Sequence, residues 1–375
     1  MRFTRPAVSA ALVGAAIVSF AGGSPAFAAS SYLGHFNQVT TVASTVPTSK
    51  TPLPGDGDVN PYGVALVEHS TGRLHRGDVL VSNFNASSNL QGTGTTIVEV
   101  SPSGSVEVFA RIPQLQGGTG LTTALAVLPR GFVVVGNLPT TNGMSATATA
   151  GSLVILDRDG GVVETLSGGD INGPWDLAAV SRGDEAALFF TNVLNGTVAA
   201  GGSVVDQGTV VRLDLDLSHA YPRVLSNTVI GSGFPERTDP NALVVGPTGV
   251  GLARSGTLYV ADTVDNTIRA IPCALGRTTS AGEGRLASST NAMQSHLNGP
   301  LGLTIAPNGD VLTVNGGDGF IVETTPWGHE VEARLIDSSG TPPGSGALFG
   351  LAIAPQSAGV YFVDDATNTL NLLGR

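Results

Sequence analysis

The sequence predicts an all-β fold in which six similar four-stranded units form one closed ring. The chain of 375 residues contains 51 Gly and 22 Pro, and only 13% of its residues are charged. This composition suits short strands joined by turns better than long helices. The other two observations are a strand signature that recurs six times along the chain and a short apolar strand that precedes each copy.

The recurring signature is a run of strand-forming residues that ends in Asn or Asp. Leu258–Asp262 is its clearest copy. Successive copies follow at intervals of about 50 to 70 residues, which indicates repeated supersecondary units. In four copies a Gly lies six positions before the final residue, where a hairpin turn needs it. The six final residues are Asn83, Asn137, Asn192, Asp262, Asn315 and Asp364.

The strand before each signature is short and rich in small residues. Four of these strands are entered through Pro: Pro61, Pro174, Pro240 and Pro300. Small side chains suit the crowded centre of a ring, where the units converge. We therefore expect innermost strands at residues 62–66, 123–127, 175–179, 241–245, 301–305 and 349–353.

A third strand and a more polar fourth strand follow the signature in most units, which predicts a six-bladed β-propeller. The last unit ends after three strands, and the N-terminal strand Gln38–Ser44 is expected to supply its fourth. Such closure removes the open sheet edges that the alternatives, an open stack or a β-sandwich pair, would leave. We expect one domain, residues 29–375, with blades near residues 60–112, 122–169, 174–231, 240–293, 299–337 and 347–375 plus 38–44.

Two segments depart from the repeat. Residues 218–238 extend the connection between the third and fourth units, and residues 277–293 are rich in Ser, Ala and Gly and make a poor fourth strand. Long loops of this kind are where a propeller would carry specificity.

The N-terminus has the form of a cleaved signal peptide. Arg2 and Arg5 precede an apolar run at residues 7–22, and Ala26-Phe27-Ala28 matches a small-residue cleavage site. We expect cleavage after Ala28, so that residues 1–28 are removed and the protein is extracellular or periplasmic. A membrane anchor is the alternative, although the apolar run is short for a span.

The acidic balance of the chain limits its partners. The formal net charge is −11 at pH 7, which disfavours nucleic acid and anionic membranes and leaves a polar ligand, a cationic partner or a metal ion. Cys273 is the only cysteine, so no intrachain disulfide can form. We expect a monomer.

The fourth unit resembles the NHL repeat in the order of Leu258–Asp262, then Asn266 and then Arg269. Residues 300–303, with Pro followed by Gly and apolar residues, resemble it too. Because the units recur, the resemblance extends over essentially the whole mature chain. It implies a propeller fold. NHL-like propellers include peptide-processing lyases, streptogramin lyase and non-catalytic interaction modules, and the neighbouring gluconolactonase-like propellers are metal-dependent lactonases. The resemblance therefore leaves function open.

Polar residues near the ends of the strands are the candidates for a site. The six Asx residues of the signature would form a ring that could hold Ca²⁺ or a polar ligand. The alternative is that each one caps its own turn. Exceptions to the repeat point to an acidic, amide-rich mouth, with candidates Asn60, Asn172, Trp175, Asp176, Asn241, His296, Asn298 and Asp318.

Motifs of nucleophilic or zinc chemistry are missing from the sequence. No Gly-x-Ser-x-Gly elbow, phosphate-binding loop or Cys-x-x-Cys is present, and the six His lack ligand spacing. The sequence favours a binding scaffold for an extracellular ligand or protein. The alternative is a metal-dependent propeller enzyme, a lyase or a lactonase, with its site at the axial mouth.

Overall fold

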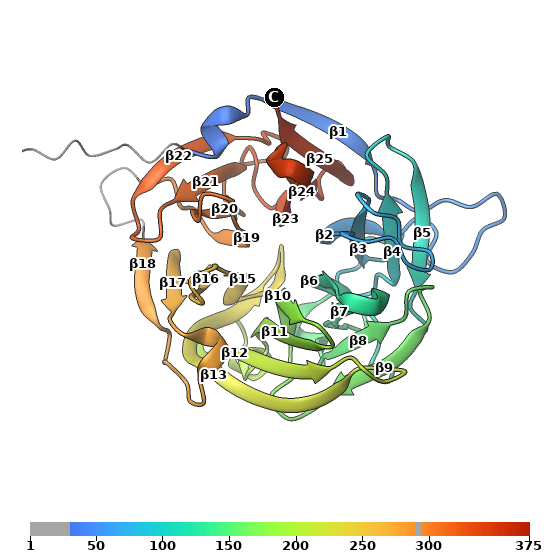
Figure 1. The fold of residues 1–375 in the computed structure, drawn as a ribbon, viewed down its shortest axis with the longest axis horizontal. Helices are drawn as coiled ribbons and strands as arrows, with labels where there is room; N and C mark the ends of the chain where they lie inside the picture. The colour runs from blue at the N-terminus through green and yellow to red at the C-terminus, as the bar shows by residue number, and fades with distance from the viewer. Residues whose placement is uncertain (1–30, 290–294) are drawn as a thin grey trace, which may run out of the picture. The chain divides into compact units, whose positions relative to one another are not determined.

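The computed structural model describes residues 31–289 and 295–375. These residues form six antiparallel sheets arranged in a ring (Figure 1), which confirms the predicted six-bladed β-propeller. The signal peptide predicted at residues 1–28 lies outside the described residues. Within the described part of the chain, no helix is long and apolar enough to cross a membrane.

The first three blades have the following strands. Blade 1 contains β2 (Val59–Leu66), β3 (Val79–Asn85), β4 (Thr96–Val100) and β5 (Val106–Arg111). Blade 2 contains β6 (Leu121–Val127), β7 (Val133–Asn137), β8 (Ser152–Leu156) and β9 (Val162–Ser167). Blade 3 contains β10 (Pro174–Arg182), β11 (Glu185–Asn192), β12 (Val205–Asp216), β13 (Arg223–Asp239) and β14 (Leu243–Val245).

The last three blades are four-stranded. Blade 4 contains β15 (Pro247–Leu252), β16 (Leu258–Asp262), β17 (Thr267–Ile271) and β18 (Arg285–Ser289). Blade 5 contains β19 (Pro300–Ile305), β20 (Val311–Asn315), β21 (Phe320–Thr324) and β22 (Glu330–Leu335). Blade 6 contains β23 (Leu348–Ile353), β24 (Val360–Asp364), β25 (Thr369–Gly374) and β1 (Gln38–Ser44).

Helices are few and short among the described residues. They are α1 (Thr197–Ala200) and the 3₁₀ turns η1 (Leu33–His35), η2 (Pro129–Gly131), η3 (Ser145–Thr147), η4 (Ala274–Gly276) and η5 (Pro355–Ser357).

The ring closes through the two ends of the chain, as the sequence predicts. Strand β1 pairs antiparallel with β25, from Gln38 opposite Gly374 to Ser44 opposite Thr369. Figure 1 shows β1 on the outside of this blade, beyond β25 and β24. The closing blade thus contains the N-terminal and the C-terminal strand side by side, and β1 covers the outer edge of β25.

The predicted innermost strand of blade 4 is wrong. Residues 241–245 were expected there, but the structure has β15 in that place and adds β14 to the end of β13. Arg237 lies opposite Val245, so the chain folds back on the long strand β13 before it enters blade 4 at Pro247. A short apolar run cannot by itself reveal which sheet it joins.

All six innermost strands start at the same end of the ring. A four-stranded antiparallel blade returns the chain to the end at which it began, and in blade 3 the short extra strand β14 folds back on the end of β13 before the chain enters β15. We call this the entry end and the opposite one the far end. The entry end also holds the ends of the second strands and the turns that lead into the third strands. The far end holds the turns that join the first strand of each blade to the second.

An aromatic plug fills the axis near the entry end. Tyr62, Trp175 and Phe349 come from the starts of β2, β10 and β23 and are buried. The Trp175 and Phe349 ring centroids lie 6.2 Å apart although blades 3 and 6 are opposite one another in the ring, and Tyr62 contacts both. The plug therefore divides the axis into a mouth at the entry end and a cavity beneath it.

Candidate functional site

The mouth of the propeller contains a polar pocket of about 620 Å³ at the entry end of the ring. Distant segments build it: the start of β2, the β3–β4 loop, the β13–β14 turn, the segment before β23 and the β24–β25 turn. Among the described residues, Asp365 is the only charged one that lines it. Six amide side chains line the rest of this mouth pocket: Asn60, Asn85, Asn89, Gln91, Asn241 and Asn368.

Backbone conformation explains why so many of these residues are Asn. Asn60, Asn89 and Asn368 have positive φ angles of 64°, 57° and 54°. Asn adopts this left-handed conformation more readily than most residues, because its short side chain can hydrogen-bond locally. The Asn60 backbone N–H donates to Asn368 Oδ1 at 2.7 Å, which joins the first blade to the last at the pocket.

Three amide oxygens of residues that line the pocket are almost completely buried and have no close hydrogen-bond partner among the described residues: Asn60 Oδ1, Asn85 Oδ1 and Gln91 Oε1. The Tyr62 hydroxyl, also without a close partner, lies beside Asn60. The orientation of the Gln91 amide follows from its partner, since Nε2 donates at 2.7 Å to the carbonyl oxygen of Pro240, which can only accept. An unpaired buried acceptor costs free energy that a cation or a donor from a ligand would recover. The pocket is therefore arranged to receive positive charge or hydrogen-bond donors.

The carboxyl group of Asp365 titrates near neutral pH. Burial, together with the nearby carboxylates of Asp364 and Asp337, raises its pKa to about 7. Burial also raises the pKa of the Tyr62 hydroxyl well above its usual value, and Asp365 adds to that shift. Asp365 thus gives the mouth pocket a negative potential and a group able to exchange a proton.

Of the predicted mouth residues, the structure brings Asn60 and Asn241 into the mouth pocket. Trp175 lies in the plug instead, where its indole N–H donates to the Val244 carbonyl at 3.2 Å. Asp176 lies beneath the plug and lines the axial cavity.

The other four predicted residues bond within nearby loops and do not line this pocket. Asn172 Nδ2 donates to the Leu194 carbonyl at 2.8 Å. Asn298 Nδ2 donates to Asp318 Oδ2 at 3.0 Å. His296 contacts Glu330, with Nδ1 at 2.5 Å from Oε1, and its ring stacks on a neighbouring phenyl ring of β21.

The six signature Asx residues do not line the mouth pocket or the axial cavity. Four Asn side chains instead fasten the segment that enters their own blade: Asn83 bonds to Thr45 O, Asn137 to Gly118 O and Gly120 N, Asn192 to Asp170 O and Gly173 N, and Asn315 to His296 O. Asp262 and Asp364 accept from backbone N–H groups three residues later, as turn caps do. Because each unit needs its entering segment or its turn held by such hydrogen bonds, Asn or Asp recurs at this position.

The axial cavity beneath the plug has a volume of about 250 Å³ and is lined from all six innermost strands. Asp176 is its one charged lining residue. Asp176 Oδ1 accepts from the Leu177 N–H at 2.8 Å and Oδ2 from the Val250 N–H at 3.0 Å. Burial raises the pKa of Asp176 to about 7, against the effect of these two hydrogen bonds. The carboxyl group joins the inner edges of blades 3 and 4.

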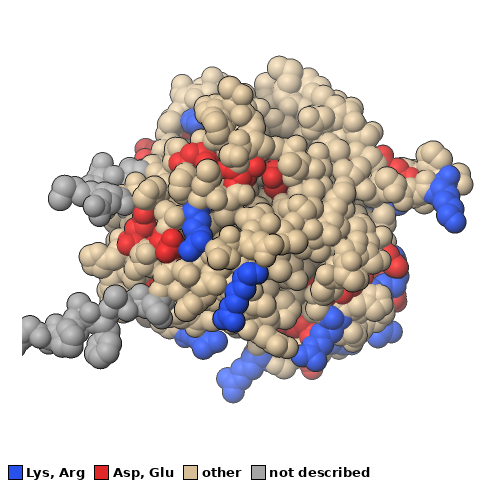
Figure 2. All heavy atoms as spheres, turned by 90° about the horizontal axis from the view of Figure 1, so that it is seen from above, with Lys and Arg blue, Asp and Glu red and all other residues tan. Residues whose placement is uncertain are grey.

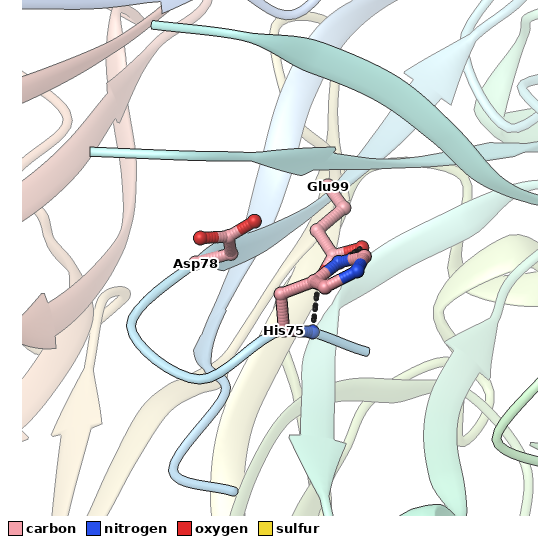
Figure 3. Close-up of side chains that lie close together, drawn as sticks. All are labelled: His75, Asp78 and Glu99. Carbon is pink, nitrogen blue, oxygen red and sulfur yellow. Dashed lines mark hydrogen bonds and ion pairs between the residues drawn. The ribbon is translucent and has the colours of Figure 1, made fainter. Parts of the chain in front are cut away.

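A first group of potential metal ligands lies at the far end of blade 1. His75, Asp78 and Glu99 place one ligand atom each within 4.8 Å of one another (Figure 3). Both Glu99 oxygens already face His75, with Oε1 accepting from the backbone N–H at 2.7 Å and Oε2 at 3.4 Å from Nδ1. Glu99 is thus already engaged by His75, through the backbone N–H and the imidazole ring.

A second group, Asp262, Asp265 and Glu283, surrounds Arg269. The guanidinium lies 2.8 Å from Glu283, 3.2 Å from Asp265 and 3.7 Å from Asp262. Arg269 therefore supplies the positive charge that a metal would bring.

On the face drawn in Figure 2, charged side chains are sparse and most of the surface is uncharged.

Several lining residues of the mouth pocket escaped the sequence-based prediction. Asn85, Asn89 and Gln91 follow Asn83 closely, and this density of amides after the first signature is the signal that could have identified them. Asn368 follows Asp365 in the same way in the last unit. Their convergence depends on ring closure, which brings the first and last blades together.

Comparisons with known proteins support the fold. No family model and no curated protein matches the chain, so the resemblance to NHL repeats stays a prediction. A gluconolactonase from Xanthomonas campestris is similar in structure, with a TM-score of 0.54 and 14% identity over 91% of this chain and 90% of that one. A streptogramin B lyase has a TM-score of 0.52 and 14% identity over 92% and 99%.

A third similar structure is regucalcin from Agrobacterium tumefaciens, described as a calcium-binding protein. Its TM-score is 0.50 and its identity 14%, over 91% of this chain and 96% of that one. At such identities the likeness establishes a shared six-bladed architecture and does not assign an activity.

Proposed function

We propose that the mouth pocket is the active site of a divalent-cation-dependent propeller enzyme, a lyase or lactonase that acts on a small oxygen-rich substrate. The observation that carries this proposal is the set of buried, unpaired amide oxygens around Asp365. The similar gluconolactonase and streptogramin B lyase folds favour an enzyme over a pure scaffold.

The donor set fits a hard cation. Ca²⁺ and Mg²⁺ prefer carboxylate and amide oxygens, and Asn60, Asn85, Gln91 and Asp365, which carry such oxygens, line one pocket. The similarity to a calcium-binding propeller supports the same choice. A bound cation would polarise a carbonyl oxygen of the substrate.

The protein's own groups would supply orientation and negative charge. The amides of Asn241 and Asn368 can donate to and accept from hydroxyl groups of a substrate. A bound cation would keep the Asp365 carboxyl ionised, so that this side chain would serve as the anionic ligand of the cation. The pocket volume of about 620 Å³ lies in the range of small-molecule sites.

A binding scaffold remains the second candidate, because the amide-lined pocket has no Ser, Cys or Lys nucleophile with a paired base. A scaffold would use the same pocket, so the two proposed functions differ only in whether the bound molecule is converted to a product. The signal peptide predicted from the sequence would put either ligand outside the cytoplasm, and the acidic net charge disfavours nucleic acid.

Cation titration and substrate turnover test the proposal together. We expect the melting temperature of the chelator-treated protein to rise with Ca²⁺, Mn²⁺ or Mg²⁺, and a panel of lactones and cyclic depsipeptides to include a substrate whose turnover needs the cation. Asp365→Asn should remove the cation response and lower turnover by about 100-fold or more. The control Asp159→Asn changes an exposed carboxylate that is not part of the pocket.

Each outcome decides between the candidates. A cation response without turnover on any substrate would favour the scaffold. If no divalent cation changes the melting temperature of either the wild type or Asp365→Asn, the metal-dependent enzyme is rejected.

A further inference from the structure

A second pocket, independent of the mouth pocket, lies at the far end of the propeller. It is a groove of about 810 Å³ between the turns of blades 4, 5 and 6. It shares Leu252 and Ile305 with the axial cavity, so its floor reaches the axis. We call it the far-end groove. Its wall contains Arg254, Arg285, Tyr259, Pro326 and Trp327.

The charge of the far-end groove is opposite to that of the whole protein. Arg254 and Arg285 line it, and no Asp or Glu does. Both side chains are exposed, and neither guanidinium has an ion-pair or hydrogen-bond partner among residues 31–289 and 295–375. Residues 1–30 and 290–294 contain no Asp or Glu that could pair with them. Two free guanidinium groups over one groove in a chain of net charge −11 favour an anionic ligand.

An aromatic platform stands beside these arginines. Trp327 is 77% exposed at the β21–β22 turn, whereas the other tryptophan, Trp175, is buried in the plug. The residue before it, Pro326, has its carbonyl oxygen 3.4 Å from the Tyr259 hydroxyl, and Tyr259 is itself buried. An exposed indole in the lining of the groove offers a flat surface for stacking.

We infer that the far-end groove binds a small organic anion with a planar apolar ring, of the aromatic carboxylate or sulfonate class. The ring would stack on Trp327, and Arg254 and Arg285 would hold the anionic group. The groove volume matches a small-molecule site rather than a protein interface. Guanidinium groups bind carboxylates in a bidentate geometry, which selects for the shape of the anionic group as well as for its negative charge.

The test uses 2-naphthoate as the probe and the uncharged 2-naphthamide as its matched partner. Isothermal titration of the full-length mature protein should show one site for 2-naphthoate and at least about tenfold weaker binding of the amide. The indole N–H signal of Trp327 should shift in NMR spectra on addition of the anion, and that of Trp175 should not.

Variants separate the two parts of the site. Arg254→Gln with Arg285→Gln should lower the affinity for 2-naphthoate by about tenfold or more and leave 2-naphthamide unchanged. Trp327→Ala should weaken both probes, because stacking serves both. Arg76→Gln removes an exposed arginine that does not line the groove and should change neither affinity.

Equal affinity for the two probes, or an unchanged affinity in the double arginine variant, would overturn the inference. All three groove residues are exposed, so their replacement should leave the fold intact, and circular dichroism checks this. Binding of an acidic peptide with no binding of 2-naphthoate would also reject a small-molecule site. Asp365→Asn should bind 2-naphthoate normally, which separates this result from that of the mouth pocket.

Discussion

The ring of Tyr62 stacks on that of Phe349 with centroids 3.8 Å apart and an angle of 18° between the planes. Tyr62 belongs to the first blade and Phe349 to the last, so this contact closes the propeller at its axis, as the pairing of β1 with β25 closes it at its rim. Both side chains are almost completely buried. Closure therefore rests on an inner contact and an outer one.

Loss of the inner contact should destabilise the whole ring. Phe349→Ala removes a buried ring that stacks on Tyr62 and lies 6.2 Å from Trp175. We expect a loss of about 3–5 kcal/mol in the free energy of unfolding, measured by urea denaturation. Phe349→Leu keeps most of the volume and should cost less. Equal stability of the alanine variant and the wild type would show that the plug does not contribute to closure.

The N-terminal segment depends on one buried carboxylate, that of Glu323 in β21. Its oxygens accept from the Tyr32 N–H at 2.7 Å, the Leu33 N–H at 2.8 Å and the Ser31 hydroxyl at 2.7 Å. Glu323→Gln replaces one acceptor oxygen by a donor, and we expect it to cost about 2–3 kcal/mol.

Hydrogen exchange checks where this loss occurs. The amides of Tyr32 and Leu33 should exchange faster in Glu323→Gln, while amides in the distant strand β8 keep their protection. Glu332→Gln, in a half-exposed neighbour of the same blade, serves as the control. Unchanged exchange at Tyr32 and Leu33 in Glu323→Gln would argue against the role of this carboxylate.

Asp176 should make stability depend on pH. Its pKa in the folded protein is about 7, above the ordinary value of 3.8. The folded state therefore holds a proton that the unfolded state has lost between about pH 4 and pH 7. Stability falls as pH rises through this window, by up to about 1.4 kcal/mol per pH unit for one group, and the full cost is present above pH 7.

Asp176→Asn isolates this contribution. The difference in unfolding free energy between wild type and variant should change across pH 4 to 7 and become constant above that range. Because Asp365 and Glu236 also have raised pKa values of about 7, only the difference between the two proteins is informative. A difference that does not vary with pH would show that Asp176 titrates normally.

Arg269 should be essential to the outer part of blade 4. It is the cation among Asp262, Asp265 and Glu283, and the side chain of Asp262 is fully buried. Arg269→Met leaves that carboxyl without its positive neighbour, and we expect a loss of about 3–5 kcal/mol in thermal or urea unfolding. Asp262→Asn in the same protein should recover part of it. No recovery in the double variant would show that packing, and not charge, explains the loss.

Particular residues show how far the sequence predicts this protein. The period of the Asx-terminated strands predicts the six blades, and the missing fourth strand of the last unit predicts the pairing of Gln38–Ser44 with β25. Both conclusions rest on local patterns of strand-forming residues and on the need to pair every edge. Residues 241–245 were misplaced because an apolar run has the same pattern whichever strand it pairs with.

The sequence by itself determined the all-β ring and the polar character of the innermost strand entries, since both recur from unit to unit. It also determined the closure, since the last unit lacks a fourth strand that the N-terminal strand can supply. Tertiary structure decided the site. The mouth pocket gathers Asn60 and Asn85 from the first blade, Asn241 from the third and Asp365 from the last, and it separates them from His296 and Asp318. These contacts arise only when the ring closes and three aromatic side chains fill its axis, and no local spacing encodes which loops then meet.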